Sequence, residues 1–159
     1  MSDLYQTSAD IRSDVQSLAR IERPSAALTL TRSSSLAITT AGTTITWQTE
    51  VRNQGFTWST TDITIPTSGF YLFNFVFKIT TTNQTALAEL KLNGNLQSFM
   101  ATNWNTTNAH SFTQMIYCTT SDVVQVVVTP TTNDTIAVTP ENGSRPSPLL
   151  HIAQLTGVI

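Results

Sequence analysis

The sequence predicts an all-β protein, a sandwich or a barrel of about eight or more short strands. Apolar and polar residues alternate over several short stretches, and turn signals separate these stretches about every 8–12 residues. Threonine, which favours strands, is abundant, whereas lysine occurs only twice. Charged residues make up 11% of the chain, against about 25% in typical proteins. We therefore expect sheets whose outer faces are polar but mostly neutral.

The most informative stretch is residues 63–79, which reads as strand, tight turn, strand. Pro66 and Gly69 supply the turn chemistry. After the turn, two apolar rows occupy the two faces of one strand: Tyr71, Phe73, Phe75, Phe77 and Ile79 on one, and Phe70, Leu72 and Val76 on the other. A half-exposed strand would alternate apolar and polar residues. Both faces therefore need cover, one from a partner sheet and the other, most simply, from a neighbouring copy of the chain.

The remaining strands follow from alternation and from turn residues. We expect them at 26–31, 36–38, 44–51, 58–65, 85–92, 96–100, 111–119, 122–129, 135–138 and 149–155. The pair Asn93 and Gly94 is a strong hairpin signal between two of these strands. Residues 103–108 read as a polar loop that carries Trp104. Asp122 reads as a turn residue that opens a strand.

The first 24 residues differ from the rest in charge content and in the spacing of their apolar residues. They hold seven of the eighteen charged residues, and their apolar residues recur at helical spacing: Leu4, Ile11, Val15 and Leu18. Ser8 can cap a helix there, and Pro24 ends the segment. A helix of this length is marginal alone and must pack on something. We therefore divide the chain into an amphipathic arm, residues 1–24, and a β domain, residues 25–159.

Several classes of function are disfavoured by what the sequence lacks. The net charge of −2 offers no basic surface for nucleic acid, and no apolar run is long enough to cross a membrane. No catalytic motif, no paired carboxylates and no cluster with metal-ligand spacing occur. Cys118, the single cysteine, is expected to be a buried and inert thiol. We expect a protein that is not an enzyme and needs no cofactor.

Three segments, in this order, resemble the trimeric jelly-roll superfamily of tumour necrosis factor and the complement globular heads. The segment from Pro66 to Phe73 is similar to the Pro-x-x-Gly-x-Tyr-x-Phe strand of that superfamily. Residues 121–126 are similar to its Gly-Asp-x-Val-x-Val strand, with Ser121 in place of the glycine. Residues 149–159 are similar to its final strand. The resemblance implies a Greek-key jelly-roll sandwich of about 8–10 antiparallel strands, here preceded by a short helical arm.

The resemblance also implies a homotrimer with one sheet lining the threefold axis. Candidate trimer contacts are the aromatic and aliphatic residues of the central strand: Phe70, Tyr71, Leu72, Phe73 and Phe75. Many relatives of this kind are bacteriophage virion proteins, and the Thr/Ser/Asn-rich chain resembles that branch. The expected function is a capsid decoration or cement protein, made in the host cytoplasm and located on the capsid surface.

Under this hypothesis the partners are other copies of the chain and the major capsid protein or another virion protein. The arm would anchor the trimer through its apolar and basic residues: Leu4, Tyr5, Ile11, Arg12, Val15, Leu18, Arg20 and Ile21. Two alternatives remain open. One is a receptor-binding tail-fibre or spike tip; the other is a soluble carbohydrate-binding module that uses Trp104 or Trp58. Trp104 is the candidate ligand contact.

Overall fold

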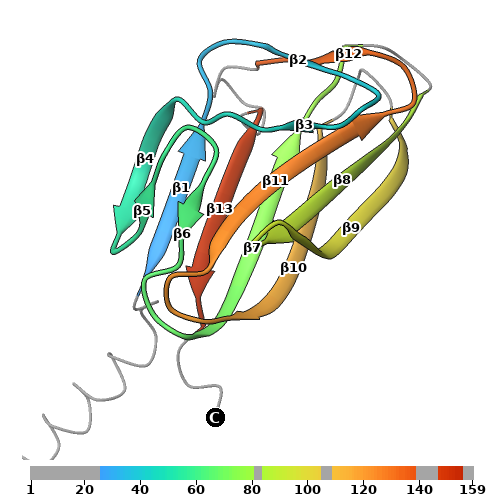
Figure 1. The fold of residues 1–159 in the computed structure, drawn as a ribbon. Coiled ribbons are helices and arrows are strands. Elements are labelled where there is room, and N and C mark those ends of the chain that lie inside the picture. The colour runs from blue at the N-terminus through green and yellow to red at the C-terminus, as the bar shows by residue number, and fades with distance from the viewer. Residues whose placement is uncertain (1–25, 81–83, 105–108, 139–146, 156–159) are drawn as a thin grey trace, which may run out of the picture.

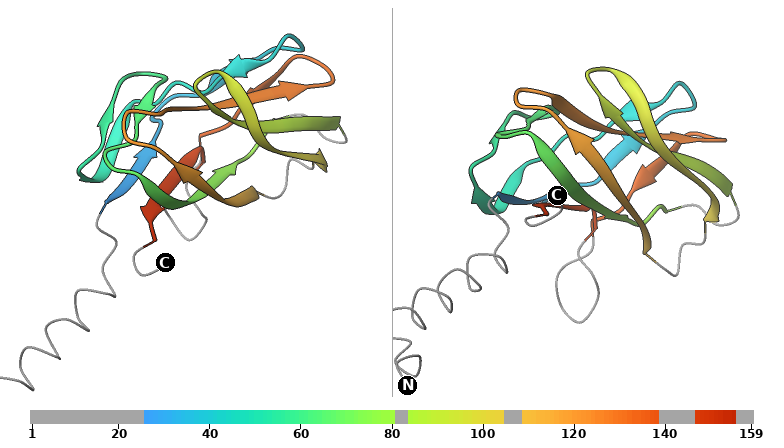
Figure 2. Two further views of the ribbon diagram at one scale, coloured as in Figure 1. Left: turned by 60° about the horizontal axis from the view of Figure 1, so that its bottom comes forward. Right: turned by 90° about the horizontal axis from the view of Figure 1, so that it is seen from below.

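The structure is a computed structural model that describes residues 26–80, 84–104, 109–138 and 147–155. Two antiparallel sheets pack face to face as a sandwich (Figures 1 and 2). The first sheet has the order β10-β7-β13-β1-β4, formed by His110–Cys118, Gly69–Phe77, Leu149–Gln154, Ala27–Thr31 and Thr49–Gln54. The second has the order β5-β6-β11-β8-β9, formed by Thr57–Trp58, Ile63–Thr64, Val123–Pro130, Gln84–Leu92 and Asn95–Trp104.

Three short strands complete the fold. β3 (Thr43–Thr44) pairs with β11 in the second sheet, and β12 (Asp134–Ile136) pairs with β2 (Leu36–Ile38). Most neighbours in each sheet are far apart in sequence; β13, for example, lies between β1 and β7. This crossing of connections between two sheets is a Greek-key jelly roll, and it confirms the expected fold class.

The core lies between the two sheets. The first sheet contributes one face of β7 and residues such as Leu28 and Ile152, and the second contributes Ile63, Leu90 and Val124, all of which are buried. Aromatic rings meet here in the edge-to-face and stacked arrangements that such rings prefer. Trp47 meets Phe75 edge-on, with ring centroids 6.1 Å apart. The core occupies one face of each sheet. On the outer face of the first sheet, Phe70 and Leu72 remain partly exposed, whereas Val76 is buried.

The expected strands are confirmed over most of their length, with three differences. The stretch 44–51 is divided into β3 and β4, although Ile45 and Trp47 between them remain buried. The stretch 58–65 is divided into β5 and β6 by a turn at Ser59 and Asp62, where the backbone N–H of Ser59 donates to the carbonyl of Asp62. β9 extends to Trp104, which is therefore in a strand and not in a loop.

The hairpin expected at Asn93 and Gly94 joins β8 to β9. Both residues have positive φ angles, 51° and 78° respectively. These values are typical of the tight turn that Asn-Gly favours, because Asn and Gly adopt positive φ angles at low steric cost. This turn was therefore predictable from two residues alone.

Candidate interaction face

The outer face of the first sheet carries the features that distinguish this sandwich. Alternation along β7 places Tyr71, Phe73 and Phe75 toward the second sheet, where each is at most 1% exposed. Phe70 and Leu72 point the other way and are partly exposed. This corrects the expectation for Tyr71, Phe73 and Phe75, which lie inside the sandwich of a single chain and are not free to contact a neighbouring copy.

Four large apolar side chains gather at one end of this outer face, and we call them the apolar patch: Phe70, Leu72, Met115 and Tyr117. The register places Tyr117 opposite Phe70, and Met115 opposite Leu72. Met115 is 50% exposed and Tyr117 is 53% exposed. The rings of Phe70 and Tyr117 meet edge-on, with centroids 5.2 Å apart. Contiguous exposed apolar side chains of this kind are typical of interaction surfaces.

A polar row crosses the same face next to the apolar patch. Its members come from all five strands and follow the register of the sheet: Thr113, Asn74, His151, Thr29 and Arg52. Asn74 Nδ2 donates to Thr113 Oγ1 at 2.9 Å, and Thr29 Oγ1 lies 2.9 Å from Nδ1 of His151. The row therefore forms an ordered polar layer in the middle of the sheet.

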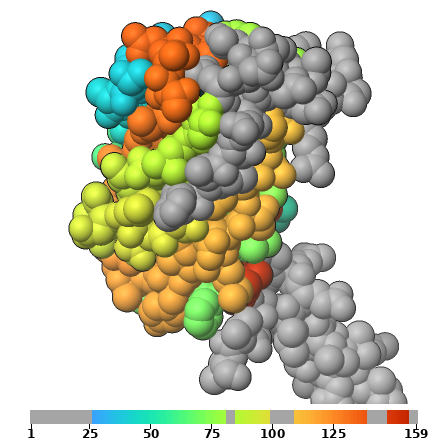
Figure 3. Space-filling view, turned by 90° about the vertical axis from the view of Figure 1, so that its right-hand side faces the viewer, coloured from blue at the N-terminus to red at the C-terminus, as the bar shows by residue number. Residues whose placement is uncertain are grey.

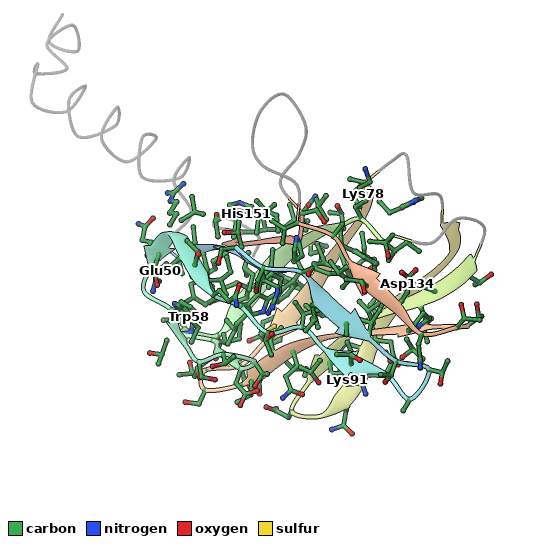
Figure 4. All side chains as sticks on the ribbon, turned by 90° about the horizontal axis from the view of Figure 1, so that it is seen from above. Glu50, Trp58, Lys78, Lys91, Asp134 and His151 are labelled. Atoms are coloured by element: carbon green, nitrogen blue, oxygen red, sulfur yellow. The ribbon has the colours of Figure 1, made fainter. Side chains whose placement is uncertain are left out.

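His151 sits at the centre of this row. Burial lowers the pKa of its imidazole, and the positive charge of Arg52 lowers it further. In Figure 4, His151 and Lys91 lie on opposite sides of the sandwich, one on the outer side of each sheet. Sequence reasoning did not single out His151, and it missed the polar row because its members are far apart in the chain.

Both ends of the described part of the chain lie at the same end of the first sheet as the apolar patch. The backbone N–H of Gln154 donates to the carbonyl of Ala26, and the N–H of Leu155 donates to the carbonyl of Phe70. Figure 1 shows the start of β1 and the end of β13 at the bottom of the molecule. Ala26, the first described residue, therefore lies at the same end of the first sheet as the apolar patch.

The two lateral edges of the sandwich are closed by polar contacts between the sheets. At one edge, Nε1 of Trp58 donates to Glu50 at 2.6 Å, and the two residues are adjacent in Figure 4. At the other edge, Ser98 Oγ donates to Gln114 at 3.1 Å, where β9 and β10 lie side by side (Figure 3). Trp58 also packs against the core. Its role in this structure is to hold an edge together.

Other predicted residues lie outside what the structure describes. The anchoring residues of the arm fall within residues 1–25, and the side chain of Trp104 is likewise not described. Within the described residues, no group of three or more His, Cys, Asp or Glu side chains could hold a metal ion. Those residues also contain no helix that is long and apolar enough to cross a membrane.

Comparison with solved structures identifies the fold. Murine APRIL at pH 5.0 superimposes with a TM-score of 0.63 at 13% identity, over 82% of this chain and 98% of that chain. Eiger TNF from S. frugiperda gives a TM-score of 0.63 at 14% identity, over 86% and 96%. The fold is the tumour-necrosis-factor-type jelly roll. No protein-family profile matches the sequence, and neither does any curated protein.

A viral protein shares this jelly roll. The vertex protein P5 of PRD1 superimposes with a TM-score of 0.60 at 18% identity, over 84% of this chain and 99% of that chain. The resemblance seen in three short motifs is thus confirmed for the fold. In this jelly roll, Pro66 and Gly69 lead into β7, Asp122 precedes β11, and residues 149–154 form β13 in the centre of the first sheet.

Proposed function

We propose that this chain is a structural virion protein that assembles as a homotrimer through the outer face of its first sheet. The observation that carries this proposal is the apolar patch. Met115 and Tyr117 are half exposed on a sheet whose other face is already committed to the core. A second copy of the chain is the cover that a trimeric jelly roll would provide, and it would shield Phe70 and Leu72 as well.

The placement of this trimer in a virion rests on two kinds of support. The sandwich superimposes on a PRD1 vertex protein over nearly the whole length of that protein. The composition, rich in neutral polar residues and low in charge, suits an exposed surface of a particle.

Within the virion, we favour a capsid decoration or cement protein held by its N-terminal arm. Residues 1–24 combine an apolar stripe with Arg12, Arg20 and Arg23. Ala26, the first described residue, lies at the same end of the first sheet as the apolar patch, so three arms would leave the trimer at one end. Three anchors acting together would bind a capsid more tightly than one, because each further contact forms at high effective concentration.

A second role, a receptor-binding tip or spike at the vertices, is favoured by one specific observation. The PRD1 protein of the same fold is described as a vertex protein. A decoration protein occurs in many copies on each particle, whereas a vertex protein or fibre tip occurs in few. Quantitative mass spectrometry of the source particle separates the two roles.

The trimer is tested by placing a charge in the apolar patch. Sedimentation equilibrium of the full-length chain is expected to give a trimer at micromolar concentration, whereas Met115→Lys should give a monomer. Because Met115 is already half exposed, the substitution leaves the core of the single chain intact. The melting curve of the variant in circular dichroism verifies that it remains folded.

A matched control uses the opposite edge of the same sheet. Val51 in β4 is 56% exposed, close to the exposure of Met115, but lies at the strand farthest from β10. Val51→Lys should remain a trimer. A wild-type chain that is a folded monomer, or a Met115→Lys variant that stays trimeric, would refute the proposed interface.

A further inference from the structure

The polar row lies next to the apolar patch on the same outer face. An interface that covers the apolar patch therefore extends over His151 and its neighbours, since Leu72 and Asn74 are two residues apart on one strand. Polar groups that lose water in an interface must find partners or remain uncharged. The chemical state of His151 then matters for assembly.

We propose that His151 makes assembly of the trimer dependent on pH, so that the trimer is stable at neutral pH and dissociates under mildly acidic conditions. This inference rests on the trimer proposed above. It follows from the position of one imidazole in the middle of the interaction face, with a guanidinium on the same row.

Among the described residues, the strands on either side of His151 place no negative charge beside it to compensate an imidazolium. Its partners in the register are Thr29 on β1 and Asn74 on β7, and the next residues of the row are Arg52 on β4 and Thr113 on β10. Its neighbours above and below on the same face are uncharged as well: Leu149, Ala153, Ala27, Thr31, Leu72 and Val76.

The charged groups nearest to this row do not stabilise an imidazolium at His151. Glu50 belongs to β4 but binds the indole of Trp58 at 2.6 Å and the amide of Asn53 at 3.0 Å. Arg52 is the charged residue that acts on His151, and it repels a second positive charge. Among the described residues, every electrostatic influence on His151 thus favours the neutral ring.

The sign of the effect follows from linkage. Burial and Arg52 already lower the pKa of His151 in the single chain. Further burial in an interface lowers the pKa again, so the trimer binds fewer protons than three separate chains do. Assembly is therefore fully favoured above the ordinary imidazole range, and it weakens as the pH falls through and below the pKa of the free chain.

The size of the effect has an upper limit. Each imidazole that must lose its proton changes the assembly constant by up to about tenfold per pH unit, and a trimer contains three. The dissociation constant of the trimer can thus rise by up to about a thousandfold per pH unit. A rise of at least about tenfold between about pH 7.5 and about pH 5.5 is the expected minimum.

The chain offers a matched control for the test, because it contains only two histidines, His110 and His151. Sedimentation equilibrium of the full-length chain is carried out across this pH range for the wild type and for both glutamine variants. We expect His151→Gln to assemble equally at both ends of the range, and His110→Gln to dissociate on acidification as the wild type does. Because Arg52 lowers the pKa of His151 in the free chain, Arg52→Gln should move the onset of dissociation to higher pH.

The outcomes separate this inference from the proposal on which it rests. A wild type that is monomeric at about pH 7.5 refutes the proposed trimer itself. A wild-type trimer whose dissociation constant does not change with pH, or a His151→Gln trimer that still dissociates in acid, refutes only the role of His151. Loss of the pH dependence in His110→Gln would refute it as well.

A second measurement decides the matter if His151→Gln does not assemble at any pH. The imidazole of His151 can be titrated by NMR in the wild-type trimer and in the Met115→Lys variant, which is the expected monomer. The pKa of His151 should be lower in the trimer than in that monomer. Equal pKa values in the two states would overturn the inference.

Discussion

The amide Nδ2 of Asn93 lies 2.7 Å from the carboxylate Oδ1 of Asp122. Asn93 is in the hairpin between β8 and β9, and Asp122 is in the turn between β10 and β11. Asn93 also accepts a hydrogen bond from the backbone N–H of Val123 at 2.8 Å. Two turns, one within the second sheet and one that connects the two sheets, are thus held together by two adjacent polar side chains.

The first prediction concerns Asp122 and pH. The backbone N–H of Thr119, which donates to the carboxylate at 2.7 Å, and the amide of Asn93 lower the pKa of Asp122. The native state therefore binds fewer protons than the unfolded chain, so the contribution of Asp122 is present above the ordinary carboxyl pKa and is lost as the pH falls through the depressed pKa.

We expect Asp122→Ala to lower the free energy of unfolding by about 1–2 kcal/mol at neutral pH. Urea unfolding monitored by circular dichroism measures this difference. The difference between the variant and the wild type should shrink when the same experiment is repeated at acidic pH, since the wild-type carboxyl is then protonated. A constant difference across the pH range would contradict the assignment.

The second prediction compares two glycines with positive φ angles. Gly42 has a φ of +88°, and a Cβ there would lie 2.9 Å from Oγ1 of Thr129. Gly94 has a φ of +78°, but a Cβ there would meet nothing within 4 Å. Alanine at either position is strained by roughly 1–2 kcal/mol, because L-residues disfavour this conformation. Only at Gly42 does a close contact add to that strain.

Thermal unfolding of the two alanine variants should therefore differ. Gly42→Ala is expected to melt at a lower temperature than Gly94→Ala, and both should melt below the wild type. Equal melting temperatures for the two variants would show that Thr129 moves away at no cost.

The third prediction concerns Cys118. Burial raises the pKa of its thiol to about 11, and the carboxylate of Asp122 contributes to the rise. The side chain is fully buried at the end of β10, so little thiolate forms near neutral pH. Iodoacetamide should label the chain only after unfolding in urea, as measured by mass spectrometry.

A related expectation follows from the single cysteine. A reductant should leave the melting temperature unchanged, because no disulfide can form within one chain. We expect the same of a chelator. A fall in melting temperature of more than about ten degrees, which corresponds to about 2 kcal/mol or more for a domain of this size, would reveal a covalent link or an ion between copies.

The fourth prediction tests the arm. Deletion of residues 1–24 should leave a folded trimer, because the apolar patch and the polar row belong to the β domain. The truncated trimer should no longer bind particles from which this protein has been stripped, as measured by co-sedimentation with the particles. Rebinding with undiminished occupancy would place the anchor in the β domain instead.

The sequence alone was sufficient where the deciding information is local. Alternation located most strands, two adjacent residues fixed the hairpin at Asn93 and Gly94, and the motif from Pro66 to Phe73 pointed to the jelly roll. These features depend on backbone preferences of a few neighbouring residues and on side chains that alternate along one strand. The fold class therefore needed no knowledge of which strands pair.

Only the tertiary structure decided which face of β7 is inside. Both rows of that strand are mostly apolar, with Asn74 as the polar member of the outer row, so its own pattern separates the two faces only weakly. The inward row is selected by the sheet that packs against Phe73 and Phe75. The end of β9 depends in the same way on a distant partner, because Trp104 pairs with Gln84 across the hairpin.

The polar row shows the same limit at the level of the site. Thr29 and His151 are 122 positions apart in the chain, and they meet because β13 inserts between β1 and β7. Pairing between distant strands is non-local, so the residues immediately before and after each partner do not identify the strand with which it pairs. The sequence by itself therefore determined which segments form strands, whereas long-range strand pairing determined which side chains share a face.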